Sequence, residues 1–341
     1  MSNLIFNAGK YVENGSKILV NCMRKRTMLL MYRFSFFEKR RDSTFIGGKF
    51  TMNNGNEFRI VITPFCNYRC FFCHSEGLVK ECTPMLLSPK DYTFAVRAAK
   101  HLWGWDTVTI TGGEPLVSPI YGEVCSLIAD EGVKITTVTN ASLIASPKKI
   151  LDKNSQLNIS LHTLDKDKYR KMTRSSYPLS QVIDTIIAVR SQLPELLIHL
   201  NSTVIRGIND SPEEMMRIIN FADRINGVAK FIDLAHKNNE LVVPFEEIDD
   251  RLWSLGFKMM VETPWQTLYE KDDKQVMVTR CGFSERAANT GYRSLFLNPD
   301  GVIMSDNQDG LSINLLKEIH EQDLEGFAKK VEWYFPPVRK V

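Results

Sequence analysis

Short runs rich in β-branched residues alternate with helical patterns from Phe58 onward, and this alternation constrains the fold more than any other feature of the chain. Two of the helical patterns begin with clear start signals, at Ser88-Pro89 and Ser211-Pro212. Strands that are separated by helices in this way pair in parallel. The sequence therefore predicts an α/β fold with a partial (β/α)6 barrel. Its strands are expected at residues 58–63, 106–111, 133–139, 157–161, 196–205 and 228–234.

The alternation stops after about Pro244, which predicts a change of architecture there. A helix is expected near 246–255, followed by strands at 275–280, 292–297 and 301–304 and a helical tail over 312–333. We therefore expect three parts. They are a basic N-terminal arm at residues 1–50, the barrel core at residues 51–244, and a small C-terminal α+β domain at residues 245–341 that covers one mouth of the barrel.

Composition indicates a soluble globular protein, with 43% hydrophobic and 24% charged residues. The formal charge of +3 is too balanced to favour nucleic acid or an anionic membrane as the main partner. Residues 1–41 are the exception, with nine basic and two acidic side chains, so this arm is either loosely held or contacts an anionic partner. No apolar stretch is long enough to span a bilayer or to form a signal peptide, so a cytoplasmic location is expected.

Three of the seven cysteines, Cys66, Cys70 and Cys73, fall within eight residues directly after the first predicted strand. The odd total of seven cysteines and the close spacing of these three indicate a metal site in a reducing compartment rather than disulfides. A cubane iron–sulfur cluster that is bound by only three thiolates leaves one iron open to a co-substrate. A zinc ion bound by the three cysteines and His74 is the alternative, although the adjacent Cys73 and His74 fit poorly around a small tetrahedral ion.

Further polar residues and glycines gather where the predicted strands end. Catalytic residues of such barrels lie on loops at the carboxyl ends of the strands. Histidines and lysines at these ends are candidates for a general acid or base. The residues concerned are Gly112-Gly113-Glu114-Pro115, Thr139-Asn140, Ser160, His162, His199, His236 and Lys237.

The cysteine triplet and the Gly-Gly-Glu-Pro stretch, in this order along the barrel, resemble the radical S-adenosylmethionine (SAM) superfamily. The resemblance implies two cofactors, a 4Fe–4S cluster on Cys66, Cys70 and Cys73 and SAM itself. Transfer of an electron to the sulfonium of SAM then releases a 5'-deoxyadenosyl radical that abstracts hydrogen from carbon. The SAM contacts implied by the resemblance are Phe72 near the adenine, Gly112, Gly113, Glu114 and Pro115 near the methionine amino group, and Asn140 and Ser160 at strand ends.

Several stretches are especially similar to the branch that contains the GTP cyclase of molybdenum cofactor biosynthesis. Arg59 falls on an arginine that contacts the nucleotide in that branch, although a strand arginine paired with a carboxylate is an equally simple interpretation. Arg59, His199 and His236 are therefore the candidate catalytic residues. The matching stretches are 59–73, 111–115, 139–140, 158–164, 201–210 and 230–234.

The resemblance breaks in the C-terminal region, where that branch carries a second cluster on three cysteines. This chain keeps only Cys281 and has Ser284 and Asp306 at the other two positions, which are poor ligands for soft metals. We therefore expect a twitch-like substrate lid without an auxiliary cluster. Two cations of that branch's nucleotide site are also replaced, by Thr109 and His199, which predicts a substrate less anionic than GTP.

The predicted function is a radical SAM enzyme that cyclises, rearranges or oxidises a small polar molecule such as a nucleoside, nucleotide, sugar or amino-acid derivative. Its electron donor is expected to be a flavodoxin- or ferredoxin-type protein. A peptide-modifying enzyme is the first alternative. Such enzymes commonly carry a cysteine-rich C-terminal domain, which this sequence lacks. The second is a non-enzymatic iron–sulfur or zinc sensor that contacts nucleic acid through the basic arm, but it leaves the strand-end motifs unexplained.

Overall fold

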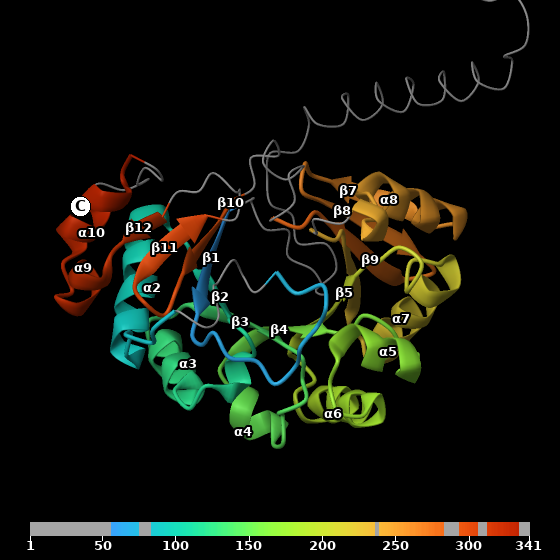
Figure 1. Cartoon of the computed structure of the whole chain (residues 1–341), viewed down its shortest axis with the longest axis horizontal. Helices are drawn as coiled ribbons and strands as arrows, with labels where there is room; N and C mark the ends of the chain where they lie inside the picture. Colours follow the sequence, from blue (N-terminus) through green and yellow to red (C-terminus); the bar gives the residue numbers. More distant parts are fainter. Residues whose placement is uncertain (1–55, 75–82, 236–238, 283–292, 306–311, 334–341) are drawn as a thin grey trace, which may run out of the picture. The chain divides into compact units, whose positions relative to one another are not determined.

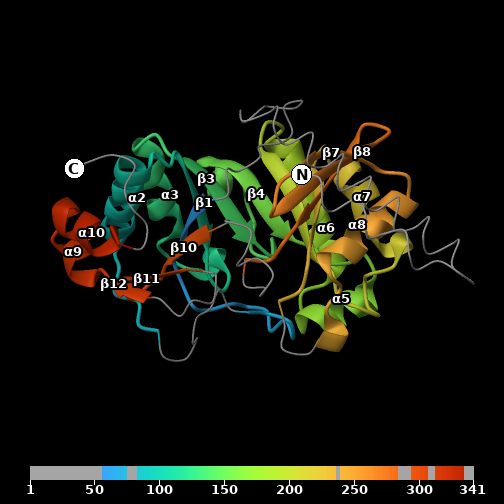
Figure 2. The same cartoon turned by 90° about the horizontal axis from the view of Figure 1, so that it is seen from above.

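The computed structural model describes residues 56–74, 83–235, 239–282, 293–305 and 312–333. Residues 46–341 form one compact unit. Its centre is a twelve-stranded sheet with the strand order β12-β11-β10-β1-β2-β3-β4-β5-β6-β9-β8-β7 (Figures 1 and 2). Each strand from β1 to β5 pairs in parallel with the next one along the chain. The predicted α/β class and parallel barrel sheet are confirmed.

All six predicted barrel strands are present, with ends that differ from the predicted ones by at most a few residues. Their bounds are β1 Asn56–Val61, β2 Thr107–Thr111, β3 Lys134–Thr139, β4 Asn154–Ser160, β5 Leu197–Thr203 and β6 Val228–Ile232. The helices that connect and follow them are α2 Pro89–Trp103, α3 Tyr121–Asp130, α4 Pro147–Leu151, α5 Lys166–Thr173, α6 Leu179–Gln192, α7 Pro212–Arg224 and α8 Phe245–Ser254, with short 3-10 turns η2 Pro115–Val117 and η3 Asn239–Leu241.

The two predicted helix starts are confirmed by their caps. Ser88 and Asp91 form a capping box at α2, in which Asp91 Oδ2 accepts from the Ser88 backbone N–H at 2.7 Å. Ser211 Oγ accepts from the Glu214 N–H at 3.3 Å at the start of α7. Such caps satisfy N–H groups that have no acceptor inside the helix.

The strands after Pro244 extend the barrel sheet at both edges. At one edge β9 (Lys274–Thr279) pairs in parallel with β6 and is followed outward by β8 (Gln266–Lys271) and β7 (Lys258–Glu262). At the other edge β10 (Arg293–Leu297) pairs in parallel with β1 and continues into β11 (Val302–Ser305) and β12 (Ser312–Asn314). The domain boundary near residue 244 stays a prediction. The strands on its two sides belong to one continuous sheet.

Two features of this region differ from the sequence-based expectation. Strands β7 and β8 were not predicted, although the β8–β9 hairpin has a local signal in Asp272 and Asp273, which both adopt positive φ as tight hairpins require. The predicted helical tail over 312–333 is wrong as a single helix. The chain forms β12, α9 (Leu316–His320) and α10 (Leu324–Val331), because Gln322 has a positive φ and Asp323 caps a new helix.

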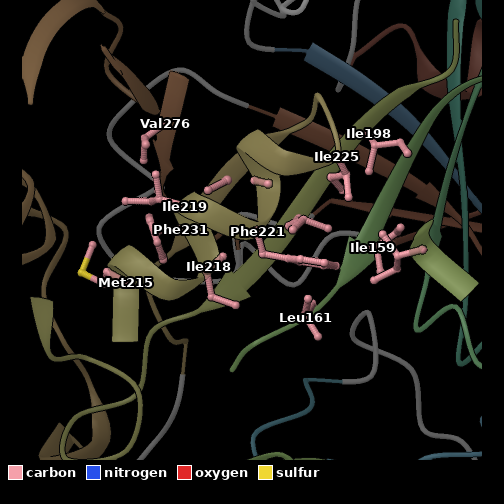
Figure 3. Packing of buried hydrophobic residues seen from close by; sticks show 14 of the residues in the cluster. Ile159, Leu161, Ile198, Met215, Ile218, Ile219, Phe221, Ile225, Phe231 and Val276 are labelled. Carbon is pink, nitrogen blue, oxygen red and sulfur yellow. The ribbon is translucent and has the colours of Figure 1, made fainter. Parts of the chain in front are cut away.

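The helices cover one face of the curved sheet, and the hydrophobic core lies between them (Figure 1). Figure 3 shows Ile159 of β4 and Ile198 of β5 in the same cluster as Ile218 and Phe221 of α7. Successive strand residues point to opposite faces, so the neighbours of these apolar residues face the inside of the barrel. That inner face carries the polar side chains described below.

Candidate functional site

The three-cysteine loop follows β1 at the carboxyl edge of the sheet. Cys66 and Cys70 are half-buried and Cys73 is exposed, and the Cys73 N–H donates to the Cys70 carbonyl at 3.2 Å in a tight turn. Thiolates are the donors that bind iron–sulfur clusters, so these three residues could hold one. Among the described residues, no group of three His, Cys, Asp or Glu side chains is placed to hold a metal ion.

Residues between the cysteines anchor the loop to α5. The N–H groups of Arg69 and Phe71 donate to the carbonyls of Thr173 and Met172, at 3.1 and 3.2 Å. These carbonyls lie at the C-terminal end of the helix, where acceptors have no intrahelical partner. Nearby, the buried hydroxyls of Tyr68 and Tyr169 hydrogen-bond each other at 2.6 Å. These hydrogen bonds define the position of the loop backbone.

The two glycines of the Gly-Gly-Glu-Pro stretch allow close contact with the cysteine loop. The N–H groups of Gly113 and Glu114 donate to the carbonyls of Thr63 and Phe65, each at 2.8 Å. A Cβ on Gly112, whose φ is 154°, would lie 2.5 Å from the Thr63 carbonyl oxygen, and one on Gly113 would overlap the Phe65 carbonyl. The resemblance assigned these glycines to contacts with SAM. The structure shows that the close approach of the cysteine loop also requires glycine at both positions.

Glu114 links the loops that follow β2 and β3. Its carboxylate is 1% exposed and accepts from Thr139 Oγ1 at 2.7 Å, the Asn140 N–H at 2.7 Å and the Leu116 N–H at 3.1 Å. Burial raises the pKa of Glu114 to about 7, and the three hydrogen bonds oppose that rise. The side chain predicted to bind an ammonium group therefore also holds this edge of the sheet together.

A closed ring of three hydrogen bonds joins Asn140 to the cysteine loop. Asn67 Nδ2 donates to Ser142 Oγ at 2.8 Å, Ser142 Oγ donates to Asn140 Oδ1 at 2.6 Å, and Asn140 Nδ2 donates back to Asn67 Oδ1 at 2.9 Å. Each group in the ring both donates and accepts, which strengthens such networks. Sequence reasoning missed Asn67 and Ser142, which carry no motif of their own.

Phe72 packs against His162, which follows β4. Their rings meet edge to face with centroids 4.8 Å apart, and Phe72 also belongs to a small apolar cluster with Met172, Ile205 and Leu234. The Thr203 N–H donates to His162 Nδ1 at 3.1 Å, which places the proton of the neutral ring on Nε2. Burial lowers the pKa of His162 to about 4, so near neutral pH this ring is uncharged.

His162 should make the fold sensitive to acid. Its pKa falls from 6.5 to about 4 on folding, so the unfolded chain binds the proton first and stability should decrease as the pH drops through this window. The largest contribution is about 3 kcal/mol. Urea unfolding at about pH 7 and about pH 4.5 should show wild type losing more stability than His162→Asn, whose amide oxygen can replace Nδ1 as acceptor. Equal losses would contradict the assignment.

The inner face of the barrel carries charges at β1 and β6. Arg59 pairs with Glu57 at 3.2 Å, stacks over Phe296 with its Cζ 5.1 Å from the ring centroid, and Thr109 also donates to Glu57. The interpretation of Arg59 as a strand arginine paired with a carboxylate is thus realised. Burial lowers the pKa of Lys230, while Glu57 raises it and Arg59 lowers it. Lys230 begins the stretch 230–234 that resembles the cyclase branch, but no role was predicted for this residue.

Polar side chains continue this inner face across β4 and β5. Gln156 Nε2 lies 2.8 Å from Asn158 Oδ1 and 3.3 Å from His199 Nδ1. Asn158 is opposite His199 in the strand register, and Ser160 is opposite Asn201. The structure therefore brings the predicted His199 and Ser160 to the same inner surface. The signal that could have found Gln156 and Asn158 is the alternation of polar and apolar residues along β4.

Two predictions concern residues at or beyond the end of β6. His236 lies outside the described residues, so its catalytic role stays a prediction. Cys281 is buried, and its backbone N–H donates to the carboxylate of Asp233 at the end of β6. Ser284 and Asp306 also lie outside the described residues, and the absence of an auxiliary cluster therefore stays a prediction. No described helix has the length and apolar character that a membrane crossing requires.

A parallel half-barrel with a three-cysteine loop after its first strand is the architecture of radical SAM enzymes. Residues 60–252 match the Radical SAM superfamily, which is more than half of the 341-residue chain. The chain belongs to this superfamily. It is therefore a radical SAM enzyme, and the cofactors of its class are a 4Fe–4S cluster and SAM.

Similar proteins point to one branch of the superfamily. The probable GTP 3',8-cyclase of Pyrobaculum aerophilum is 28% identical over 287 residues, which are 81% of this chain and 91% of that protein. The GTP 3',8-cyclase of Alkaliphilus oremlandii is 37% identical over 165 residues, 47% of this chain and 50% of that protein. SuiB of Streptococcus suis bound to S-adenosylmethionine superposes with a TM-score of 0.58 at 15% identity, over 83% of this chain and 66% of SuiB, which shows the shared fold.

Proposed function

We propose that Cys66, Cys70 and Cys73 hold the cluster and that the chain uses it to cleave SAM reductively. The observation that carries this proposal is the set of direct hydrogen bonds between the cysteine loop and the loops after β2 and β3. Through them, the three-cysteine loop lies at the same edge of the sheet as Glu114. The cluster supplies the electron that converts SAM into a 5'-deoxyadenosyl radical.

The substrate in this proposal is a nucleoside or a nucleotide with few negative charges. Its general class is supported by the similarity to GTP 3',8-cyclases. Its low charge is supported by the inner face, where amide and imidazole groups of Asn158, Gln156 and His199 lie together and Glu57 offsets the charge of Arg59 beside Lys230. Amides and imidazoles recognise the donors and acceptors of a base or ribose, whereas phosphates require cations.

The test is an anaerobic assay of the reconstituted, dithionite-reduced protein with SAM and a panel of nucleosides, nucleoside monophosphates and GTP. Formation of 5'-deoxyadenosine, measured by chromatography, should increase with the true substrate. A fully loaded cluster that gives no 5'-deoxyadenosine with any member of the panel would contradict the nucleoside proposal. A parallel assay with short peptides would show whether the chain instead modifies peptides.

We propose a flavodoxin- or ferredoxin-type protein as the electron donor and the reducing cytoplasm as the location of the enzyme. Two features of the cysteine loop support a docking site there: Cys73 is exposed, and the neighbouring Phe65 is 59% exposed. Such an apolar side chain beside a redox site suits a transient protein contact. Reduction by flavodoxin should therefore slow in Phe65→Ser, while reduction by dithionite should not change.

A further inference from the structure

Four cations lie where the cysteine loop meets α5. Arg69 belongs to the loop, Arg170 and Lys171 lie in the last turn of α5, and Arg174 is the residue that ends the helix. The Arg69 N–H donates to the Thr173 carbonyl at 3.1 Å, so the loop lies directly against this end of the helix (Figure 2). We call Arg69, Arg170, Lys171 and Arg174 the basic collar of the cysteine loop.

The basic collar presents uncompensated positive charge to solvent. All four of its residues are exposed, and in the part of the chain that the structure describes none of them forms an ion pair. The acidic residues of this segment, Asp165 and Asp167, lie at the N-terminal end of α5. Arg174 stacks over Phe71 with its Cζ 5.9 Å from the ring centroid, which holds one positive charge beside the cysteines. This face of the loop is therefore positively charged.

Helix stabilisation alone does not explain the collar. Cations at a helix C-terminus interact favourably with the helix dipole, and this accounts for Arg170 and Lys171. Arg69 is not part of the helix, yet it adds its charge at the same place. The collar also borders the proposed cluster site, because Cys73 and Phe65 of the same loop are exposed. Positive charge around an accessible redox centre increases the rate at which a negatively charged protein associates there.

We propose that the basic collar is the docking surface for an electron-donor protein with an acidic surface. This inference rests on the proposed function, since it requires the cluster on the same loop. Carboxylates of the donor lie against the four cations, and Phe65 supplies an apolar contact. One electron passes from the reduced donor to the cluster, so the donor is oxidised and the cluster is reduced with no further reactant. A small contact with long-range attraction suits a partner that must leave after each transfer.

Rapid-mixing reduction of the reconstituted full-length chain tests the docking surface. The donor is a purified, reduced flavodoxin with a net negative charge, and photoreduced 5-deazariboflavin is a small uncharged reductant for comparison. The second-order rate with flavodoxin should fall about tenfold between about 0.05 M and about 0.5 M salt, because added ions screen the attraction between exposed charges. The rate with 5-deazariboflavin should not depend on salt.

Neutral variants locate the attraction. Arg69→Gln and Arg174→Gln should each lower the flavodoxin rate about threefold at low salt, and replacement of all four collar residues by Gln should remove most of the salt dependence. Arg224→Gln is the matched control and should keep the wild-type rate. Arg224 also lies in the last turn of a helix and stacks over a ring, with its Cζ 5.0 Å from the centroid of Phe221. Helix α7, however, ends just before β6 begins, at the opposite edge of the sheet from the cysteine loop.

The outcomes separate the docking surface from the proposed function. Every variant should retain the iron content and the 5-deazariboflavin rate of wild type. A flavodoxin rate that does not depend on salt, or one that all four substitutions leave unchanged, would overturn the docking surface. So would equal slowing with both reductants, which would show that the collar tunes the cluster itself, or loss of oligonucleotide binding as the only effect of the four substitutions. A loaded cluster that accepts no electron even from 5-deazariboflavin would contradict the proposed function, and the docking surface with it.

Discussion

Alanine at Cys66, Cys70 or Cys73 is expected to abolish both cluster iron and 5'-deoxyadenosine formation. The reconstituted wild type should hold about four iron atoms per chain, as a cubane does. All three thiols lie on one loop that backbone hydrogen bonds hold in place, so each substitution removes a ligand without changing the rest of the loop. Two remaining thiolates cannot replace the three that such a cluster requires. Iron analysis and the visible absorption spectrum measure the loss.

Two cysteines outside the loop provide matched controls. Cys125 is buried in α3, and burial raises the pKa of its thiol to about 12, so it does not supply a thiolate. Cys281 is also buried. Cys125→Ala and Cys281→Ala should retain the full iron content. A loss of about half of a larger iron load in Cys281→Ala would reveal a second cluster, and one zinc per chain in place of iron would establish the zinc alternative.

The sequence predicted the barrel well because local patterns determine most of it. Apolar residues alternate along β4 and β5, and caps such as Ser88 and Ser211 mark helix starts, so strands and helices could be located without tertiary information. The C-terminal strands were harder. Their place at the two sheet edges depends on pairing with distant strands. β9 pairs with β6, which lies more than forty residues earlier in the sequence, and β10 pairs with β1, which lies much farther away.

The site was predictable in its residue types but not in its contacts. The cysteine spacing and the Gly-Gly-Glu-Pro stretch assigned the candidate residues to the carboxyl edge of the sheet, where the structure brings these two loops together. The sequence could not show that Asn140 bonds Asn67, because these residues are 73 positions apart and their two motifs carry no sign that they meet. It also could not show that Gly113 faces the Phe65 carbonyl, because such packing depends on how two loops meet.

GTP is expected to bind poorly, and Glu57 provides the physical reason. The carboxylate pairs with Arg59 at 3.2 Å and accepts from Thr109, which stands where the related cyclases are expected to have an arginine. A triphosphate near Arg59 would therefore meet the negative charge of Glu57 and a cation that is already paired, and Lys230 alone does not match its several negative charges. Each charge-assisted contact is worth about 1.5–3 kcal/mol, so two missing contacts correspond to about a hundredfold or more in affinity.

Glu57→Gln should reverse part of this discrimination. Removal of the carboxylate charge breaks the Glu57–Arg59 ion pair and lifts the repulsion, so GTP should bind about tenfold more tightly while an uncharged nucleoside changes little. Glu131→Gln is the matched control, because Glu131 also pairs with an arginine, Arg97, at 3.7 Å, but on the outer side of the sheet. Anaerobic calorimetry compares the three proteins. Micromolar binding of GTP by wild type, with turnover to a cyclised guanosine product, would show that the chain accepts the triphosphate despite Glu57.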